Sequence, residues 1–160
     1  MHKRIRQAAL FTTLTMTLAV ALGGTARAQS VGTWKLNLAK SKYKAGRAPR
    51  RATHTIEPAG AGVKTIVDGV SADGTVRHYE FTAKYDGKDN PLVGNSANGD
   101  MISFTRINAT TTQAVTKHGG QVAVTMILVV SSDAKTLTIT STGTNVFGQA
   151  VKNVSVYDRQ

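Results

Sequence analysis

The chain has 160 residues and a formal net charge of +11, from 20 Lys and Arg against 9 Asp and Glu, and it has no cysteine. The absence of cysteine excludes disulfides, thiolate metal sites and thiol nucleophiles. A chain of this length, with 41% hydrophobic residues, can fold around its own apolar core.

The start of the chain has the three parts of a bacterial Sec-type signal peptide. They are a cationic start at Met1–Arg6, an apolar run at Ala8–Gly23 and a small-residue cleavage site at Ala26-Arg27-Ala28. We expect removal of residues 1–28 to leave residues 29–160 as a single β-barrel domain, periplasmic or secreted, with no membrane-spanning segment. The alternative is an uncleaved anchor, but a span needs about 20 apolar residues and threonines interrupt this run.

Basic residues gather after the predicted cleavage site. No acid lies between Gln29 and Glu57, whereas seven Lys and Arg lie between Lys35 and Arg51. This local positive field favours anionic envelope lipid or polysaccharide as a partner, and a solvated loop is the alternative. Nucleic acid is not expected, because the stretch has one tyrosine and no stacking platform. The candidate anionic-surface patch consists of Lys40, Lys42, Lys44, Arg47, Arg50 and Arg51.

Alternating apolar residues predict strands along the rest of the chain. Gly32–Asn37 is the first, with Trp34 and Leu36 on one face, and a polar connection with room for a helical turn follows. Pro58-Ala59-Gly60-Ala61-Gly62 is expected to end the second strand, because a strand interior does not tolerate it. The later predicted strands are Thr53–Ile56, Val63–Val67, Thr75–Tyr85, Pro91–Gly94, Met101–Ile107, Thr111–Lys117, Gln121–Val130, Thr136–Thr142 and Val151–Tyr157.

Two of these strands have informative patterns. Successive strand residues point to opposite faces, so one face of Thr75–Tyr85 is mostly aromatic. The residues of that face are Tyr79, Phe81, Ala83 and Tyr85. The continuous apolar run Met126–Val130 predicts burial on both faces, or an aggregation-prone strand if it lies at an edge.

The spacing of the strands predicts the fold class. Short strands recur at roughly 8 to 12 residues, with turns mostly too short for crossover helices, which indicates an all-β protein. Tight turns between consecutive strands favour a meander, which removes its exposed edges by closing on itself. The predicted fold is therefore an antiparallel up-and-down (meander) β-barrel of about 8–10 strands. A Greek-key sandwich is the alternative.

The opening Val31-Gly32-Thr33-Trp34-Lys35-Leu36 resembles the first strand of the calycins, the lipocalins and intracellular fatty-acid-binding proteins, where a G-x-W segment starts an up-and-down barrel. The resemblance implies that Gly32 lets the chain bend into the barrel and that Trp34 plugs one end. An indole does bury a large apolar area, and glycine permits close backbone approach. The longer pattern G-T-W-K-L-N-x-x-K-S is similar to small exported bacterial proteins of unassigned function.

Two departures separate the chain from fatty-acid-binding proteins. The connection after the first strand is too short and too basic for the two lid helices of that family. The family's closing R-x-Y, which holds a carboxylate, corresponds to Ser155-Val156-Tyr157, which has the tyrosine alone. A ligand carboxylate would then meet Arg106 or Arg77. Arg159 is expected to cover Trp34, as a late arginine does in lipocalins.

Aromatic and apolar residues from several strands form the candidate lining of a ligand cavity. A narrow barrel can also be packed solid by its own side chains, and both outcomes stay open. The many threonines and the 6% aromatic content favour a void. The candidate ligand-binding residues are Tyr79, Phe81, Tyr85, Phe104, Arg106, Met126 and Tyr157.

Known catalytic patterns are absent from the sequence, which has no phosphate loop, G-x-S-x-G elbow or H-E-x-x-H. His78 and Glu80 share a strand face and, with Arg77, are weak candidates for metal or acid–base chemistry; such a pair is typical of a solvated face. His54 and His118 are expected to be surface imidazoles beside turns. No catalytic residue, metal or cofactor is assigned.

Three function classes follow. The leading hypothesis is an exported, non-enzymatic, lipocalin-like protein that binds a small apolar or amphiphilic ligand. The second is a cell-envelope structural or interaction protein that uses the basic loop on anionic surfaces. The third is a hydrolase or isomerase in the barrel mouth, built around His78, Glu80 and Arg77.

Overall fold

The computed structural model describes residues 29–44 and 47–160. The predicted signal peptide lies outside the described residues, as do Ala45 and Gly46 of the basic connection. In the described ranges, no helix combines the length and the apolar character needed to cross a bilayer.

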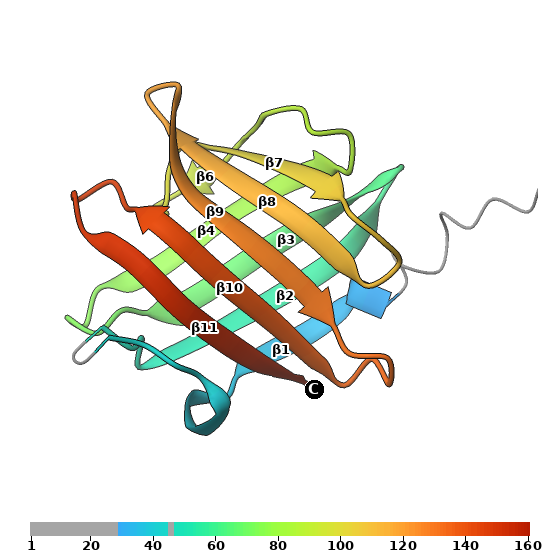
Figure 1. The fold of residues 1–160 in the computed structure, drawn as a ribbon, viewed down its shortest axis with the longest axis horizontal. Helices are drawn as coiled ribbons and strands as arrows, with labels where there is room; N and C mark the ends of the chain where they lie inside the picture. The colour runs from blue at the N-terminus through green and yellow to red at the C-terminus, as the bar shows by residue number, and fades with distance from the viewer. Residues whose placement is uncertain (1–28, 45–46) are drawn as a thin grey trace, which may run out of the picture.

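The described chain forms one antiparallel sheet of 11 strands and one short 3-10 helix (Figure 1). The strands are β1 (Gly32–Leu36), β2 (Arg51–Ala59), β3 (Gly62–Val70), β4 (Val76–Lys84), β5 (Asn90–Pro91), β6 (Val93–Gly94), β7 (Met101–Arg106), β8 (Thr111–His118), β9 (Gln121–Val130), β10 (Thr136–Thr144) and β11 (Ala150–Arg159), and the helix is η1 (Leu38–Lys40). The prediction of an all-β meander barrel is confirmed, and the two-residue strands β5 and β6 account for the higher strand count.

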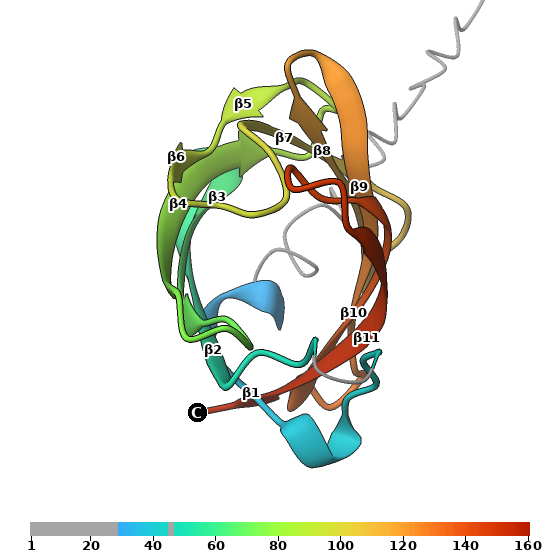
Figure 2. The ribbon, with the colours of Figure 1, turned by 90° about the vertical axis from the view of Figure 1, so that its left-hand side faces the viewer.

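The sheet curves into a ring, as the view in Figure 2 shows. Consecutive strands are neighbours except around β5 and β6, in the order β5-β7-β8-β9-β10-β11-β1-β2-β3-β4-β6. β1 pairs with β11, with Trp34 opposite Arg159 and Leu36 opposite Tyr157. Just beyond β1, the Asn37 N–H donates to the C=O of Val156 at 2.8 Å. The predicted pairing of the first and last strands is therefore confirmed.

The antiparallel registers define two ends of the barrel. At the first, called the Gly32 end, β1 begins and β11 ends. The turns at the Gly32 end are 59–62, 85–89, 107–110 and 131–135. The other is called the Arg51 end because β2 begins there. It carries the connection 37–50 and the turns 71–75, 95–100, 119–120 and 145–149.

The ring closes a second time between β4 and β7, without a continuous ladder; this closure is called the β4–β7 seam. β6 pairs with β4, whereas β5 pairs with β7. A single bridge joins Asp86 to Thr105 at the Gly32 end. The predicted strand Pro91–Gly94 is thus divided between the two sides of the seam, with Leu92 buried between its halves.

One predicted strand boundary is wrong. β2 continues through Pro58 to Ala59, and β3 begins at Gly62. Ala59 and Gly62 are the close pair of a two-residue hairpin, so Pro58 occupies the next, non-hydrogen-bonded position of that ladder. On its other side, β1 begins only opposite Ile56. The missing N–H of Pro58 therefore costs no ladder bond.

The apolar run of β9 is neither buried on both faces nor at an edge, contrary to both predicted outcomes. β9 pairs with β8 on one side and β10 on the other. Met126 and Leu128 face the interior of the barrel, whereas Val129 on the outer face is 38% exposed. A barrel gives every strand one inner and one outer face, and it leaves this run no free edge.

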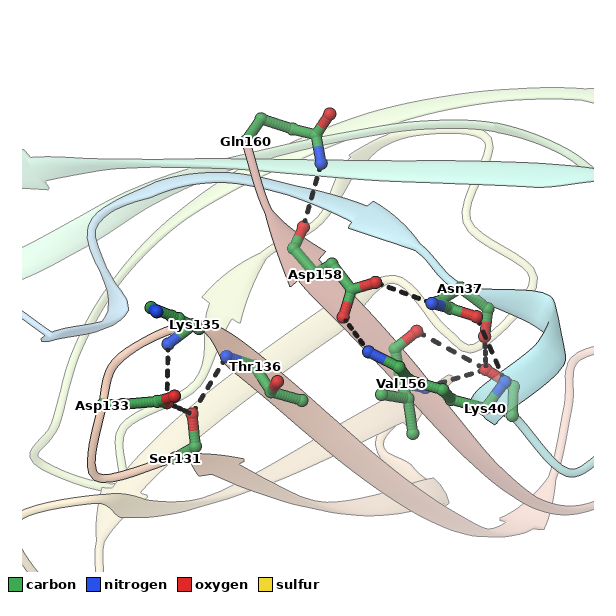
Figure 3. A network of polar contacts seen from close by, with 10 residues as sticks. Asn37, Lys40, Ser131, Asp133, Lys135, Thr136, Val156, Asp158 and Gln160 are labelled. Atoms are coloured by element: carbon green, nitrogen blue, oxygen red, sulfur yellow. Dashed lines mark hydrogen bonds and ion pairs between the residues drawn. The ribbon is translucent and has the colours of Figure 1, made fainter.

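The connection after β1 lies against β11 (Figure 3). The Asn37 side chain accepts from the Lys40 N–H at 3.1 Å and so caps η1, the expected helical turn. The Asn37 amide donates to Asp158 at 2.6 Å, and Lys40 Nζ lies 2.9 Å from the other oxygen of that carboxylate. Hydrogen bonds from Asn37 and Lys40 hold the pKa of Asp158 below its usual value. Lys42 then bridges to Val154.

Candidate ligand-binding cavity

A cavity extends along the inside of the barrel. Its lining includes Arg106 and Thr110 near the Gly32 end and Ser96 and Asn98 near the Arg51 end. The empty space is about 820 Å³, including the part open to solvent, and the centre of a water molecule can reach about 70 Å³ of it. The cavity is therefore long and narrow, and it suits a slender molecule. Its apolar lining includes Ile56, Val63, Ile102, Leu128, Val130 and Ile139.

Most of the candidate ligand-binding residues meet at this cavity. Those that line it are Tyr79, Phe81, Tyr85, Phe104, Arg106 and Met126. Tyr157 does not line it but lies beside it, 6% exposed, where its ring packs edge-on against His54 with 4.7 Å between the centroids. Burial raises the pKa of Tyr157 well above its usual range. Six of the seven candidate ligand-binding residues thus meet at the cavity, where β4, the turn after it, β7 and β9 place them. Tyr157 is not part of the cavity lining.

Aromatic side chains bridge the β4–β7 seam on its inner side. The ring centroids of Phe81 and Phe104 are 5.4 Å apart in a T-shaped contact, and those of Tyr85 and Phe104 are 6.0 Å apart. The guanidinium carbon of Arg106 lies 3.7 Å from the Tyr85 ring centroid, a cation–π contact. Among the described residues no carboxylate pairs with Arg106. The seam side of the cavity thus joins packed rings to an unneutralised cation.

His54 is not a surface residue, contrary to the prediction. It lies in the middle of β2, opposite Trp34 on β1 and Val67 on β3, and it lines the cavity. Burial lowers its pKa from 6.5 to about 4, so the imidazole is neutral at pH 7. The alternation of His54 with Ile56 carried this signal, because it places both on one face. His118 lies at the surface as predicted, with 59% of its side chain exposed.

Two hydroxyl groups lie on the same wall as His54. Thr65 of β3 is 3% exposed, and its Oγ1 has no hydrogen-bond partner among the described residues. Tyr79 of β4 stands in one register row with His54, since both are paired with Val67. Burial raises the pKa of Tyr79 to about 12. The sequence interpretation included Tyr79 and missed Thr65, because nothing local distinguishes one strand threonine from the many others.

Trp34 is fully buried where β1 joins β11. Its indole N–H donates to the C=O of Ser30 at 2.8 Å. The guanidinium carbon of Arg159 lies 4.2 Å from the centroid of the indole. The prediction that Arg159 covers Trp34 is confirmed.

The same guanidinium ties residues 29–31 to the Gly32 end. It donates to the C=O groups of Ala134 and Val31 at 2.5 Å each, and to the C=O of Gln29. In Figure 2 the short blue helical segment at residues 29–30 lies within the outline of the ring of strands. Gly32 has a φ of 135°, and a Cβ there would lie 2.5 Å from Arg159 Nη1. This geometry requires glycine at the position where the calycin resemblance placed it.

The candidate anionic-surface patch belongs to the connection at the Arg51 end. Lys40 is ion-paired with Asp158. In the part of the chain that the structure describes, the other five patch residues are exposed and none has an acidic partner within salt-bridge distance. These five, called the free basic patch, are Lys42, Lys44, Arg47, Arg50 and Arg51.

The structure does not assemble the candidate catalytic group, since none of its three residues lines the cavity. His78 projects from the outer face of β4, and its Nδ1 lies 2.7 Å from Asp68. Glu80 shares that face and lies 2.9 Å from Lys64. Arg77 instead bonds to loop groups at the Arg51 end. No group of three His, Asp or Glu in the described ranges could hold a metal ion.

Comparison with known proteins places the fold and not a family. No family model matches the chain, and no curated protein matches it in sequence. Among solved structures, the chain is similar to a redesigned β-barrel, mFAP1, bound to DFHBI, with a TM-score of 0.50 and 12% sequence identity. The match covers 85% of this chain and 100% of that chain. At this identity the two share a barrel fold.

Proposed function

We propose that this protein is an exported binding protein that holds a slender apolar or amphiphilic molecule lengthwise inside its barrel. The observation that carries the proposal is the cavity, which is lined along its length by apolar and aromatic side chains with a few polar groups, the usual composition of a small-molecule site. The barrel of similar fold is itself bound to DFHBI, which supports a binding role. The signal-peptide pattern supports export.

Arg106 gives the proposed ligand its polar end. An Arg guanidinium that faces a cavity and has no carboxylate partner favours an anionic group. Its position over Tyr85 near the Gly32 end leaves the apolar length of the cavity for a hydrocarbon tail. We therefore propose an amphiphile whose anionic head lies at Arg106.

Filling the cavity tests the binding role. Ala114 is fully buried and lines the cavity, so we expect Ala114→Phe to weaken the binding of the hydrophobic fluorophore Nile red by at least about tenfold. Thr112→Phe is a second filling variant for the case that the first fails to fold. Thr82→Phe on the exposed outer face of β4 is the matched control and should leave binding unchanged. Equal Nile red binding by all four proteins would overturn the proposal.

Charge removal tests the polar end. Arg106→Gln should weaken the displacement of Nile red by nonanoate about tenfold, because a charge-assisted hydrogen bond is lost. Arg77→Gln is the matched control, since Arg77 bonds to Ser71 and Asn95 outside the cavity. An identical response of the two variants would place the head of the ligand elsewhere.

A second candidate function is attachment to anionic envelope surfaces. The specific observation is the free basic patch, five exposed cations that no described acid neutralises, at the Arg51 end. Each such cation near an anionic membrane contributes on the order of 1 kcal/mol, and salt screens the attraction. Attachment at this end would leave the Gly32 end with Arg106 facing away from the surface.

Vesicle binding tests the second function. Neutralising Lys42, Lys44 and Arg47 should release the protein from phosphatidylglycerol vesicles at low salt. A matched triple change at Lys84, Lys88 and Lys135, all exposed, removes the same charge elsewhere and should have a smaller effect. Equal loss in both triple variants would show that only net charge matters and would overturn a role for the patch.

A further inference from the structure

The wall formed by β2, β3 and β4 differs from the rest of the cavity in its polar groups. The opposite wall, from β8 to β10, presents mainly apolar side chains. On that wall the hydroxyl of Thr116 already donates a hydrogen bond to the C=O of Asn98 at 2.7 Å. On the β2–β4 wall, by contrast, the polar groups of His54, Thr65 and Tyr79 have no hydrogen bond within the described part of the chain.

His54 is the central group of this wall. His54 is half-buried and lines the cavity, where a ring nitrogen without a protein partner needs a hydrogen bond from water or a ligand. The imidazole of His54 contacts Tyr157 only through the ring, in an edge-on aromatic contact. Its nitrogens therefore keep their hydrogen-bonding capacity for a molecule inside the cavity.

Tyr79 and Thr65 carry hydroxyl groups on the same wall of the cavity as the imidazole. Tyr79 lies two strands from His54 in the same register row, and Thr65 lies on the strand between them. The Thr65 hydroxyl is enclosed and has no partner among the described residues, so rotation about the Cα–Cβ bond can bring it towards a ligand. All three groups are uncharged at pH 7, since the imidazole is buried as its neutral form and a phenol remains protonated.

We propose that His54, Tyr79 and Thr65 form a hydrogen-bonding subsite for a neutral oxygen, a carbonyl or hydroxyl group, on the apolar body of the ligand. This inference rests on the proposed function and names the ligand class more closely. An imidazole and a hydroxyl can each donate or accept, so the subsite accommodates both oxygen types. The subsite is distinct from Arg106, which lies towards the Gly32 end and suits an anion. The ligand is thus an oxygenated apolar molecule, and a plain hydrocarbon chain leaves these groups unpaired.

Paired competitors of equal chain length test the subsite. Dibutyl ketone and nonane have the same number of carbon atoms, and each is used to displace Nile red from the protein. His54→Phe should weaken displacement by the ketone about tenfold and leave nonane unchanged, because only the ketone loses a hydrogen bond. Tyr79→Phe, which removes a single oxygen, should act in the same direction by a few fold.

The control is Tyr43→Phe. It removes the same phenolic oxygen from a side chain that bonds to Ser155 at 2.6 Å and does not line the cavity. This variant should leave the displacement of Nile red by the ketone and by nonane unchanged. Should His54→Phe fail to fold, the imidazole ¹⁵N signals of the unchanged protein provide the same test. They should shift on addition of the ketone and stay in place with nonane.

Each remaining outcome overturns the subsite. An equal loss of ketone and nonane binding in His54→Phe would show a packing role only. An unchanged ketone affinity in both variants would show that bound water satisfies these groups. The failure of the subsite is distinguishable from the failure of the proposed function: in the first case nonane still displaces Nile red, and in the second Nile red does not bind.

Discussion

The barrel closes at β1–β11 by a backbone ladder and at the β4–β7 seam mainly by side chains. At β1–β11, three residue pairs continue into the bonds of Asn37 and Lys42, and Arg159 covers Trp34. At the seam, a single bridge and two two-residue strands join the walls, and the Phe81–Phe104 contact spans the gap inside. The comparison teaches that the barrel is fastened by backbone bonds where its first and last strands pair, and mainly by side-chain contacts where its candidate ligand residues lie.

The difference has a physical reason. A ladder fixes register through many backbone bonds, whereas contacts between aromatic rings tolerate small displacements. The edge of β4 that lacks a long partner is satisfied locally. The side chain of Asn95 accepts from the His78 N–H and donates to the C=O of Val76, both at 2.7 Å. An asparagine thus takes the place of a neighbouring strand, and the seam keeps its polar groups paired without a continuous sheet.

The largest expected effect is at the β1–β11 closure. Trp34→Ala should lower the free energy of unfolding by about 4 kcal/mol, because it removes a fully buried indole and leaves a cavity. Leu92→Ala, at the buried centre of the seam, should cost less, since the two short strands can relax around it. Urea unfolding of both variants measures the difference. An equal cost at the two positions would break the comparison.

His54, which lies on β2 beside the β1–β11 closure, should contribute most to the pH dependence of the free energy of unfolding. The unfolded chain protonates this imidazole below its ordinary pKa of 6.5, whereas the folded protein resists protonation until about 4. The contribution of neutral His54 to the free energy of unfolding is therefore fully present above pH 6.5. It is lost as the pH is lowered to 4, by up to about 3 kcal/mol. His54→Phe should flatten this part of the curve, and His118→Gln should not. Thermal unfolding between these pH values shows which variant changes the profile.

Removing the arginine cover should have an intermediate effect. Arg159→Met keeps an apolar chain over Trp34 but loses the bonds to three carbonyl groups and the cation–π contact. We expect a loss of about 2 kcal/mol in the free energy of unfolding. Arg159→Lys keeps the charge without the forked geometry and should recover less than half of that loss. A stability within about 0.5 kcal/mol of the unchanged protein would contradict the fastening role.

The smallest expected effect is at the seam. Asn95→Ala should destabilise the protein by about 1 kcal/mol, since the bonds are exposed to water, yet it should speed amide hydrogen exchange at His78. Asn145→Ala removes a comparable exposed turn asparagine, which accepts from the Phe147 and Gln149 N–H groups of its own turn and makes no hydrogen bond to β4 among the described residues. Its exchange effect should stay within the turn. Faster exchange at His78 in both variants would remove the special role of Asn95.

Much of the fold could be predicted from the alternation of apolar and polar residues, which repeats every two positions in a strand. The alternation in Thr75–Tyr85 predicted the inner face of β4 correctly, and the aromatic residues of that face line the cavity. The errors arose where a neighbouring strand decides the outcome. Pro58 is tolerated in β2 because β1 has not yet begun beside it, and His54 lines the cavity because the curvature of the sheet turns its face of β2 inward. Neither fact is local to the residue concerned.

The sequence by itself determined the all-β class, the meander order, the closure of first strand on last and the covering of Trp34 by Arg159. The first three features depend on hydrophobic period and turn chemistry, which are local, whereas the covering of Trp34 by Arg159 was implied by the resemblance to lipocalins. Only the tertiary structure decided that the wall has a seam, and that His54 and Thr65 face the cavity beside Tyr79. The physical reason is that register and curvature are set by pairs of strands, so the convergence of side chains depends on residues distant in the chain.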